Sequence, residues 1–253
     1  MLFRSDIGGG GAFGSGGLTG VWAETNTREA IYAALRRRET FATSGPEIRL
    51  RFFGGWNVAD DTLSSPNWVT VAYRDDAPMG GDLPSRPGSA GAPGFVVQAA
   101  KDPTSGNLDR IQVVKIWLDH GDYREKVFDV VWSPERQRDP ATGKVPPVKN
   151  TVDLTTATYT NDVGAPTLSG VWHDPEFDPA VPAVYYARAI EIPTPRWSTI
   201  LAVKRDLPLP KQLPATIQER AVSSPIWYTP TAAQAAKSGS SRLARRGASP
   251  VHG

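Results

Sequence analysis

The sequence predicts an α+β, mainly β protein in which a short α/β element is followed by a mostly antiparallel β domain. The first observation is one amphipathic helix pattern near the amino terminus. The second is a two-residue alternation of apolar and polar side chains in Ile48–Phe53, Ile111–Leu118 and Val184–Ile192, which gives each strand a core-facing side. The third is the presence of 24 glycines and 23 prolines, which favours many turns between short strands.

Four segments follow from this pattern. Residues 1–20 are Gly-rich and predict a disordered entry. Residues 21–46 predict a helix and a strand that end an α/β unit. Residues 47–230 predict the β-rich domain, and residues 231–253 predict a disordered tail. The alternative is a single α+β domain in which the amino-terminal helix packs directly on the sheet.

The predicted helix covers about residues 27–38. Asn26 is expected to be its N-cap, with Glu29 three residues later in a capping-box-like position. The three arginines at 36–38 favour the negative end of the helix dipole. We interpret them as a solvated helix end in preference to a phosphate site. The apolar stripe consists of Ile31, Ala34 and Leu35.

In the β-rich segment, the first strand has Ile48, Leu50 and Phe52 on one face. Segments 94–100, 110–119 and 123–132 are separated by turn sequences and predict an antiparallel meander. The Thr-rich segment 150–158 is expected to be extended, and Pro225–Thr229 is expected to be the closing strand. Segment 183–192 is expected to place one set of side chains on a common face, namely Val184, Tyr186, Ile190 and Ile192.

Composition excludes several classes of site. The formal net charge is +2, but the last 23 residues carry four basic and no acidic side chains, so the preceding 230 residues sum to −2. This balance does not favour a nucleic-acid partner. With no Cys, thiol catalysis and cysteine-ligated zinc are excluded. No apolar run has the roughly 18 residues of a membrane-spanning helix, and the compartment is left open.

The residues offer few candidates for catalysis or metal binding. The three histidines, His120, His173 and His252, do not form a metal-binding motif. The cluster His173, Asp174, Glu176 and Asp178 could ligate a hard cation, but the interleaved prolines favour an acidic surface loop. Neither Ser44 nor the Ser pair at 223–224 lies in the G-x-S-x-G context of a nucleophile elbow.

Several long blocks in order carry a resemblance to a known family. They include GLTGVWAETNTREAIYAALRRRETFATSGPEIRLRFFGGW (17–56), PMGGDLP (78–84), LDRIQVVKIWLD (108–119), GKVPPVKNTVDLTTATYTNDVGA (143–165), YYARAIEIPTPRWST (185–199) and ATIQERAVSSPIWYTP (215–230). Together the chain resembles the carboxy-terminal portion of domain-of-unknown-function family 3604. That family in turn resembles the polymerase-and-histidinol-phosphatase (PHP) superfamily of metal-dependent hydrolases.

The resemblance implies a fold and a chemistry. Residues 26–45 would finish an α/β barrel, and the rest would form an appended β-sandwich-like domain. The His-rich metal motifs of the superfamily would lie in an amino-terminal barrel portion that is missing here. The full-length parent would then use a divalent metal (Mn, Zn or Fe) on an unknown small-molecule ester or phosphoester, while this chain alone would bind no metal and catalyse nothing.

Three residues are candidates for approaching such an active site. Glu24 precedes the helix, and Thr43 and Ser44 end the strand before Gly45-Pro46, where the active sites of α/β barrels gather. All three also suit ordinary capping or turn roles. The second hypothesis, from a different class, is a non-catalytic β module for ligand binding or domain packing. Its support is the aromatic strands and the many turns.

Overall fold

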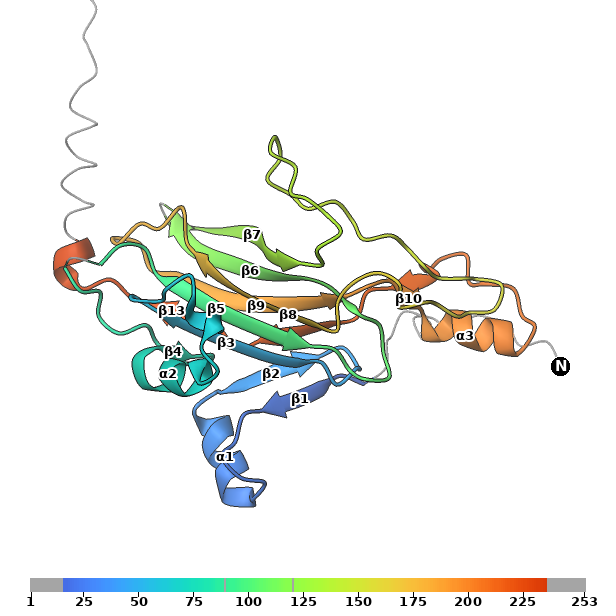
Figure 1. Ribbon diagram of the computed structural model, residues 1–253, viewed down its shortest axis with the longest axis horizontal. Helices are drawn as coiled ribbons and strands as arrows, with labels where there is room; N and C mark the ends of the chain where they lie inside the picture. Colours follow the sequence, from blue (N-terminus) through green and yellow to red (C-terminus); the bar gives the residue numbers. More distant parts are fainter. Residues whose placement is uncertain (1–15, 89, 120, 236–253) are drawn as a thin grey trace, which may run out of the picture.

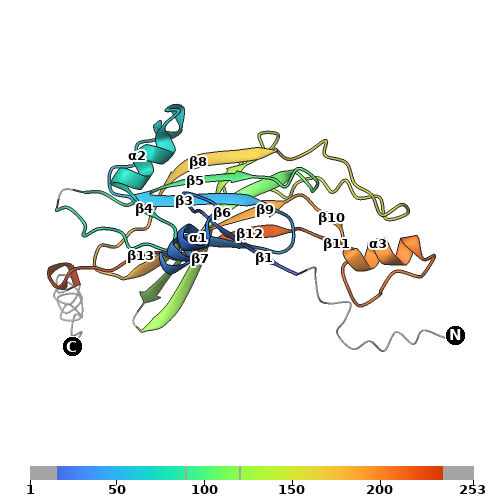
Figure 2. The same ribbon diagram turned by 90° about the horizontal axis from the view of Figure 1, so that it is seen from below.

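Two antiparallel β-sheets packed face to face form the body of the protein (Figures 1 and 2). The computed structural model describes residues 16–88, 90–119 and 121–235. The protein is mainly β, as the sequence predicted. In the part of the chain that is described, neither sheet closes into a barrel.

The larger sheet has seven strands, in the order β1-β2-β12-β9-β6-β7, with β13 also paired to β9. All of these pairings are antiparallel. The strands are β1 (Leu18–Val21), β2 (Thr40–Thr43), β6 (Leu108–Asp119), β7 (Asp122–Trp132), β9 (Ala183–Glu191), β12 (Arg220–Ser223) and β13 (Ile226–Tyr228).

The smaller sheet has four strands in the order β4-β3-β5-β8, again antiparallel throughout. A separate two-stranded ribbon, β10-β11, lies beside α3 at one end of the molecule (Figure 2). These elements are β3 (Arg49–Gly55), β4 (Ala77–Pro78), β5 (Gly94–Ala100), β8 (Thr167–His173), β10 (Thr194–Pro195), β11 (Thr216–Ile217) and α3 (Trp197–Lys204).

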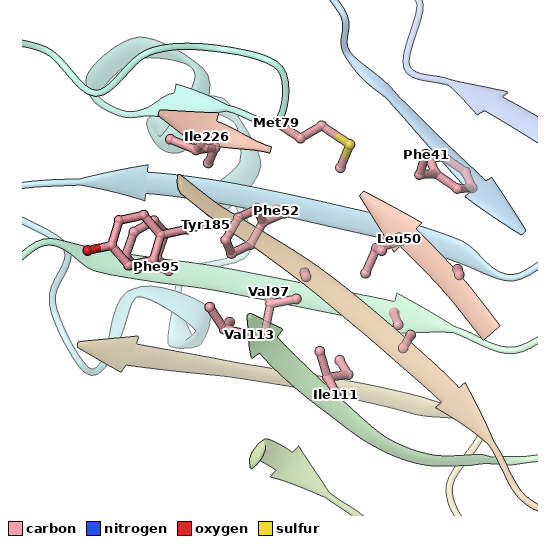
Figure 3. Packing of buried hydrophobic residues seen from close by; sticks show 14 of the residues in the cluster. Phe41, Leu50, Phe52, Met79, Phe95, Val97, Ile111, Val113, Tyr185 and Ile226 are labelled. Atoms are coloured by element: carbon pink, nitrogen blue, oxygen red, sulfur yellow. The ribbon is translucent and has the colours of Figure 1, made fainter. Parts of the chain in front are cut away.

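The main core lies between the two sheets (Figure 3). Phe52 and Phe95 come from the smaller sheet, and their rings stack at a centroid distance of 5.4 Å. The Phe95 ring also meets the ring of Tyr185 from the larger sheet at 4.6 Å. Side chains of alternate residues reach this interior because strand side chains have a period of two.

A second, smaller core covers the outer face of the four-stranded sheet. Phe53 and Val96 point outward there and pack against α2 (Trp68–Asp75), with the Phe53 and Trp68 rings edge to face at 6.0 Å. This explains why Phe53 is buried even though it follows Phe52. A short 3-10 turn, η2 (Thr62–Ser64), precedes the helix. Neither element was expected from the sequence.

The segment 21–46 differs from the expected end of an α/β barrel. Its strand, β2, pairs antiparallel with β1 on one side and with β12 on the other. It therefore belongs to the same sheet as the later strands, whereas the strands of an α/β barrel are parallel. Helix α1 (Arg28–Arg36) is capped by Thr27, whose hydroxyl oxygen accepts from the Ala30 amide at 3.3 Å, so the predicted Asn26 cap is one residue early.

Helix α1 does not lie flat on the sheet. It projects from the edge near β1 (Figure 1). Of its expected apolar stripe, Ala34 is fully buried, whereas Leu35 is 46% exposed. The alternative prediction was a helix packed directly on the sheet. Only part of the apolar stripe of α1 is buried, so the helix does not pack on the sheet along its whole apolar stripe.

Two of the strand predictions need correction, and a third is confirmed. Segment 94–100 is not part of a meander with the next two segments, because β5 pairs with β3 and β8 in the other sheet, while β6 and β7 form a hairpin. Segment 150–158 forms turns with one isolated bridge, Asp153 to Thr158. The closing strand is confirmed as β13.

In β9 the core-facing side is the opposite of the one predicted. Tyr185 and three alanines, at 183, 187 and 189, are buried, whereas Val184, Tyr186 and Ile190 are only half-buried. Of the predicted face, only Ile192, which follows the strand, is fully buried. Small residues suit this face because the large rings of Phe52 and Phe95 from the opposing sheet occupy the space. The terminal segments 1–15 and 236–253 lie outside the described residues.

Replacing Phe95 by Ala should destabilise the fold by about 3–5 kcal/mol, since its buried ring contacts those of Phe52, Trp172 and Tyr185. Chemical denaturation measures this change. Tyr32→Ala is the control, because Tyr32 is 60% exposed on α1 and its loss should cost no more than about 0.5 kcal/mol. Equal losses for the two variants would contradict the assigned core.

Candidate functional site

A small hollow near one end of the packed sheets is the candidate site. It has a volume of about 110 Å³ and is lined by Lys115, Trp117, Leu118, Asp119, Glu176, Phe177, Asp178, Val181, Ala183 and Tyr185. These residues come from the end of β6, the loop after β8 and the beginning of β9. In the ribbon view this end of β6 lies away from α3 (Figure 1).

Lys115 reaches the hollow because of the strand period. Ile111 and Val113 point into the core from β6, and Lys115 is the next residue on the same side. Its cross-strand neighbour in β9 is Tyr185. The ammonium group therefore lies at the end of the hydrophobic interior, and Lys115 is only 5% exposed.

Asp174 neutralises this buried cation. The Lys115 Nζ lies 2.6 Å from the Asp174 Oδ2 and donates to the backbone carbonyl of Glu176 at 2.8 Å. The Tyr185 hydroxyl donates to the same Oδ2 at 2.7 Å, and the Glu176 amide donates to Oδ1 at 2.9 Å. A carboxylate that is 2% exposed needs such donors, because an unpaired buried charge is strongly destabilising.

The aromatic side chains around the ion pair affect its chemistry. Burial, and then the Asp174 carboxylate, raise the pKa of Tyr185 well above its ordinary value, so its phenol remains a proton donor. The Lys115 Nζ lies 5.3 Å from the ring centroid of Trp117 and 5.9 Å from that of Tyr185. Both distances are within the range of cation–π attraction.

Three further carboxylates line the hollow, and each has a partner. Asp119 lies 3.4 Å from the Nε of Arg124, and Glu176 pairs with Lys126. The Asp178 Oδ1 accepts from the amide of Ala180 at 2.8 Å. The hollow therefore combines one cation and several carboxylate acceptors with apolar ring surfaces.

The structure separates Glu24 from Thr43 and Ser44, the other two residues expected near an active site. Glu24 is exposed in the loop after β1, whereas Thr43 ends β2. In the antiparallel β1-β2 pair, Val21 lies opposite Thr40 and Leu18 opposite Thr43. Glu24 therefore follows the end of β1 that lies beside Thr40, whereas Thr43 is at the other end of β2. The two ends of β2 are three residue steps of about 3.3 Å apart, or roughly 10 Å.

Thr43 and Ser44 lie beside the end of β12. The Thr43 hydroxyl accepts from the Gly45 amide at 3.3 Å, which is a turn role. The Ser44 hydroxyl donates to the Glu219 carboxylate and accepts from the Arg220 amide at 2.9 Å. These contacts join β2 to β12, and a role for Glu24, Thr43 and Ser44 near a barrel active site stays a prediction.

The acidic cluster after β8 is divided between two environments. His173 is exposed and its Nε2 lies 3.1 Å from Asp60, whereas Asp174 is buried against Lys115. Among the described residues, no three or more His, Asp or Glu side chains are placed to share a metal ion. His120 and His252 lie outside the described residues.

A second polar network is structural. The Arg110 guanidinium contacts Asp109 at 3.2 Å and Asp129 at 3.1 Å, and it donates to the carbonyl of Val145 at 2.9 Å. Arg136 adds a 2.6 Å ion pair to Asp109. All four charged side chains are nearly buried, and the network ties loop 133–148 to β6 and β7.

Glu191 is the third buried charged site. Its carboxylate accepts from the Ser105 hydroxyl at 2.7 Å, but its other oxygen has no hydrogen-bond partner among the described residues. Burial, with Glu219 and Asp102 as additional negative charges, raises the pKa of Glu191 to about 7. The folded state therefore favours the protonated carboxyl group.

The sequence indicated the strands of the hollow but not the hollow itself. Tyr185 is buried in the core, and Trp117 is partly buried against it. The signal that could have found the site is Lys115, a charged residue on the apolar face of an otherwise regular strand. Only the fold brings Asp174 beside it.

Replacing Lys115 by Met should cost about 3–5 kcal/mol, because the buried Asp174 carboxylate loses its cation. Adding Asp174→Asn should recover part of this loss. Lys126→Met is the matched control: Lys126 lies directly opposite Lys115 in β7 but pairs with Glu176 at the surface. Its loss should cost at most about 1 kcal/mol. Chemical denaturation that ranks the two variants equally would contradict the assignment.

The stability of the protein should depend on Glu191 between about pH 4.5 and 7. Because its pKa is raised in the folded state, its contribution is fully present below about 4.5 and is lost as the pH rises through about 7. The expected loss is about 3 kcal/mol. Glu191→Gln should flatten this part of the stability–pH curve, whereas Glu125→Gln, at an exposed site in β7, should not. Parallel curves for wild type and Glu191→Gln would refute this assignment.

Comparison with known proteins places the chain in a family. A search of the curated proteins and a search of the solved structures gave no match. No helix among the described residues is long and apolar enough to span a membrane. One family model, described as "Protein of unknown function (DUF3604)", matches residues 6–230. Since this match covers most of the 253 residues, the chain belongs to the DUF3604 family.

Proposed function

We propose that this chain is a β-sandwich module that binds a small neutral polyhydroxyl ligand, such as a single sugar unit, in the hollow at Lys115. The observation that carries the proposal is the lining of the hollow, in which an ammonium group, carboxylates and aromatic rings converge. This develops the hypothesis of a non-catalytic binding module.

The charges of the hollow favour a neutral ligand. A free anion would meet the carboxylates of Asp119, Glu176 and Asp178, and like charges at short distance repel. A free cation would compete with Lys115, which already occupies the position between Asp174 and the rings of Trp117 and Tyr185. A neutral ligand avoids both costs.

Hydroxyl groups match the available partners. A hydroxyl both donates and accepts hydrogen bonds, so it could donate to the carboxylates and accept from Lys115. Trp117 and Phe177 line the hollow and supply apolar surface for the carbon side of a sugar ring. Small-molecule sites typically combine such apolar walls with a few polar groups that fix orientation.

The size of the hollow limits the ligand. Its volume of about 110 Å³ corresponds to the space of roughly four water molecules. This is enough for part of one ring, with the remainder exposed to solvent. Binding in the millimolar range, about −4 kcal/mol, is therefore expected.

Saturation-transfer NMR with glucose, galactose and mannose tests the proposal. At least one of the three sugars should bind the wild-type protein, and Trp117→Ala should weaken that binding about tenfold, equal to about 1.4 kcal/mol. Trp197→Ala is the matched control, because Trp197 is an exposed Trp on α3 and does not line the hollow. Binding of phosphate or choline in place of the sugars would contradict the neutral-ligand assignment, and no binding of any sugar would refute the proposal.

The metal-dependent hydrolase expected from the PHP resemblance remains a separate prediction about a longer protein. Phosphoester and carboxyl ester assays of the full-length parent, beside calorimetric titration of that protein with manganese and zinc, distinguish the hydrolase from the binding module. Turnover that requires the metal and survives Trp117→Ala would support the hydrolase at a site other than the hollow. Sugar binding without turnover would support the binding module.

A further inference from the structure

Helix α3 has an unusual distribution of buried and exposed residues. Ser198 and Thr199 are buried, with 8% and 1% exposure, whereas Trp197, Ile200 and Leu201 are 42–46% exposed. In most surface helices of globular proteins the large apolar residues face the core. In α3 the large apolar residues face outward, and the small residues Ser198, Thr199 and Ala202 are buried.

The orientation of the helix is fixed by specific contacts. The Thr199 hydroxyl donates to the Ala215 carbonyl at 2.7 Å, and the Arg196 amide donates to the same carbonyl at 3.0 Å. Strand β10 directly precedes Arg196, and strand β11 directly follows Ala215. Their pairing holds the two ends of this segment together. The small polar side therefore faces the protein, and the apolar side faces outward.

The outward side of the helix carries three large apolar side chains. Trp197, Ile200 and Leu201 are spaced by three and four residues, so they share one helix face. Leu207, just after the helix, is 56% exposed. Figures 1 and 2 both show α3 at one end of the molecule, beyond the strands of the two main sheets. We call these four residues the α3 patch.

Basic residues lie near the α3 patch in the sequence. Segment 196–215 contains four basic residues and one acid, Asp206. Lys204 continues the helix face of the patch one turn further, and Arg205 and Lys211 are also exposed. A tryptophan and aliphatic residues rimmed by lysine and arginine are typical of segments that bind the interface of a lipid bilayer.

From the apolar face and its charge, we propose that the α3 patch docks on an anionic lipid surface. The patch is small, with four side chains, whereas a stable protein interface involves about 20–30 residues on each side. A lipid surface needs no complementary shape, and its negative headgroups attract exposed basic residues such as Lys204 and Arg205. This proposal does not depend on a ligand in the hollow.

Sedimentation with vesicles tests the proposal on the full chain. The wild type should bind vesicles of mixed phosphatidylserine and phosphatidylcholine more strongly than vesicles of phosphatidylcholine alone, and salt should weaken the binding. Ile200→Ser combined with Leu201→Ser should reduce the partition coefficient about tenfold. Lys204→Gln combined with Arg205→Gln should remove most of the preference for anionic vesicles.

Tyr32→Ser is the matched control, because Tyr32 is a similarly exposed apolar residue on α1. It should leave vesicle binding unchanged. Far-ultraviolet circular dichroism confirms that each variant is folded. Wild-type protein that stays in solution with anionic vesicles would overturn the proposal, as would an equal loss in Tyr32→Ser. A dimer in size-exclusion chromatography that Ile200→Ser and Leu201→Ser dissociate would instead assign the patch to a second copy of the chain.

Discussion

Contact between the facing sides of the two sheets is the interaction on which the rest of this structure depends. Phe95 is central to it, because its ring meets Phe52 in its own sheet and Tyr185 in the other. No disulfide contributes, since the chain has no Cys. Burial of apolar surface between the sheets is therefore the main stabilising contribution, as in most globular proteins of this size.

The same contact determines where the candidate site lies. Tyr185 belongs to the core through its ring and to the hollow through its hydroxyl, which donates to Asp174. Packing against Phe95 fixes the ring, so the hydroxyl can reach the carboxylate in only a narrow range of positions. The ion pair between Lys115 and Asp174 is buried at this end of the core, next to the Tyr185 hydroxyl. In this protein the position of the site is a consequence of core packing.

Polar contacts specify parts of the fold that apolar burial leaves undetermined. The network around Arg110 anchors loop 133–148, which has few apolar residues of its own. The contacts of Ser44 with Glu219 and Arg220 join the first strands to a strand near the end of the chain. Most of these polar groups have hydrogen-bond partners inside the structure, which is the usual condition for burying them. The Arg136 Nε is an exception among the described residues. They also explain why residues that suggest chemistry in the sequence can have structural roles.

Local sequence determined the strands and their alternation but not their partners. The pattern of Ile48, Leu50 and Phe52 correctly indicated a strand and its buried face, because the two-residue period is a property of the strand itself. The meander prediction was wrong because β5 pairs with β3 and β8 in the other sheet, and nothing within segment 94–100 encodes that choice. In β9 the larger residues suggested the wrong core face, since the opposing sheet leaves room for alanine there.

The candidate site shows the same division. The sequence alone determined that the chain is mainly β, that it has no thiol chemistry, and that the acidic residues after β8 lie close together in the chain. Only the tertiary structure decided that Asp174 is buried beside Lys115 while His173 faces solvent. It also decided that the apolar residues of α3 face outward. The physical reason is that burial depends on which distant segment covers a residue, and such contacts are absent from any short stretch of the chain.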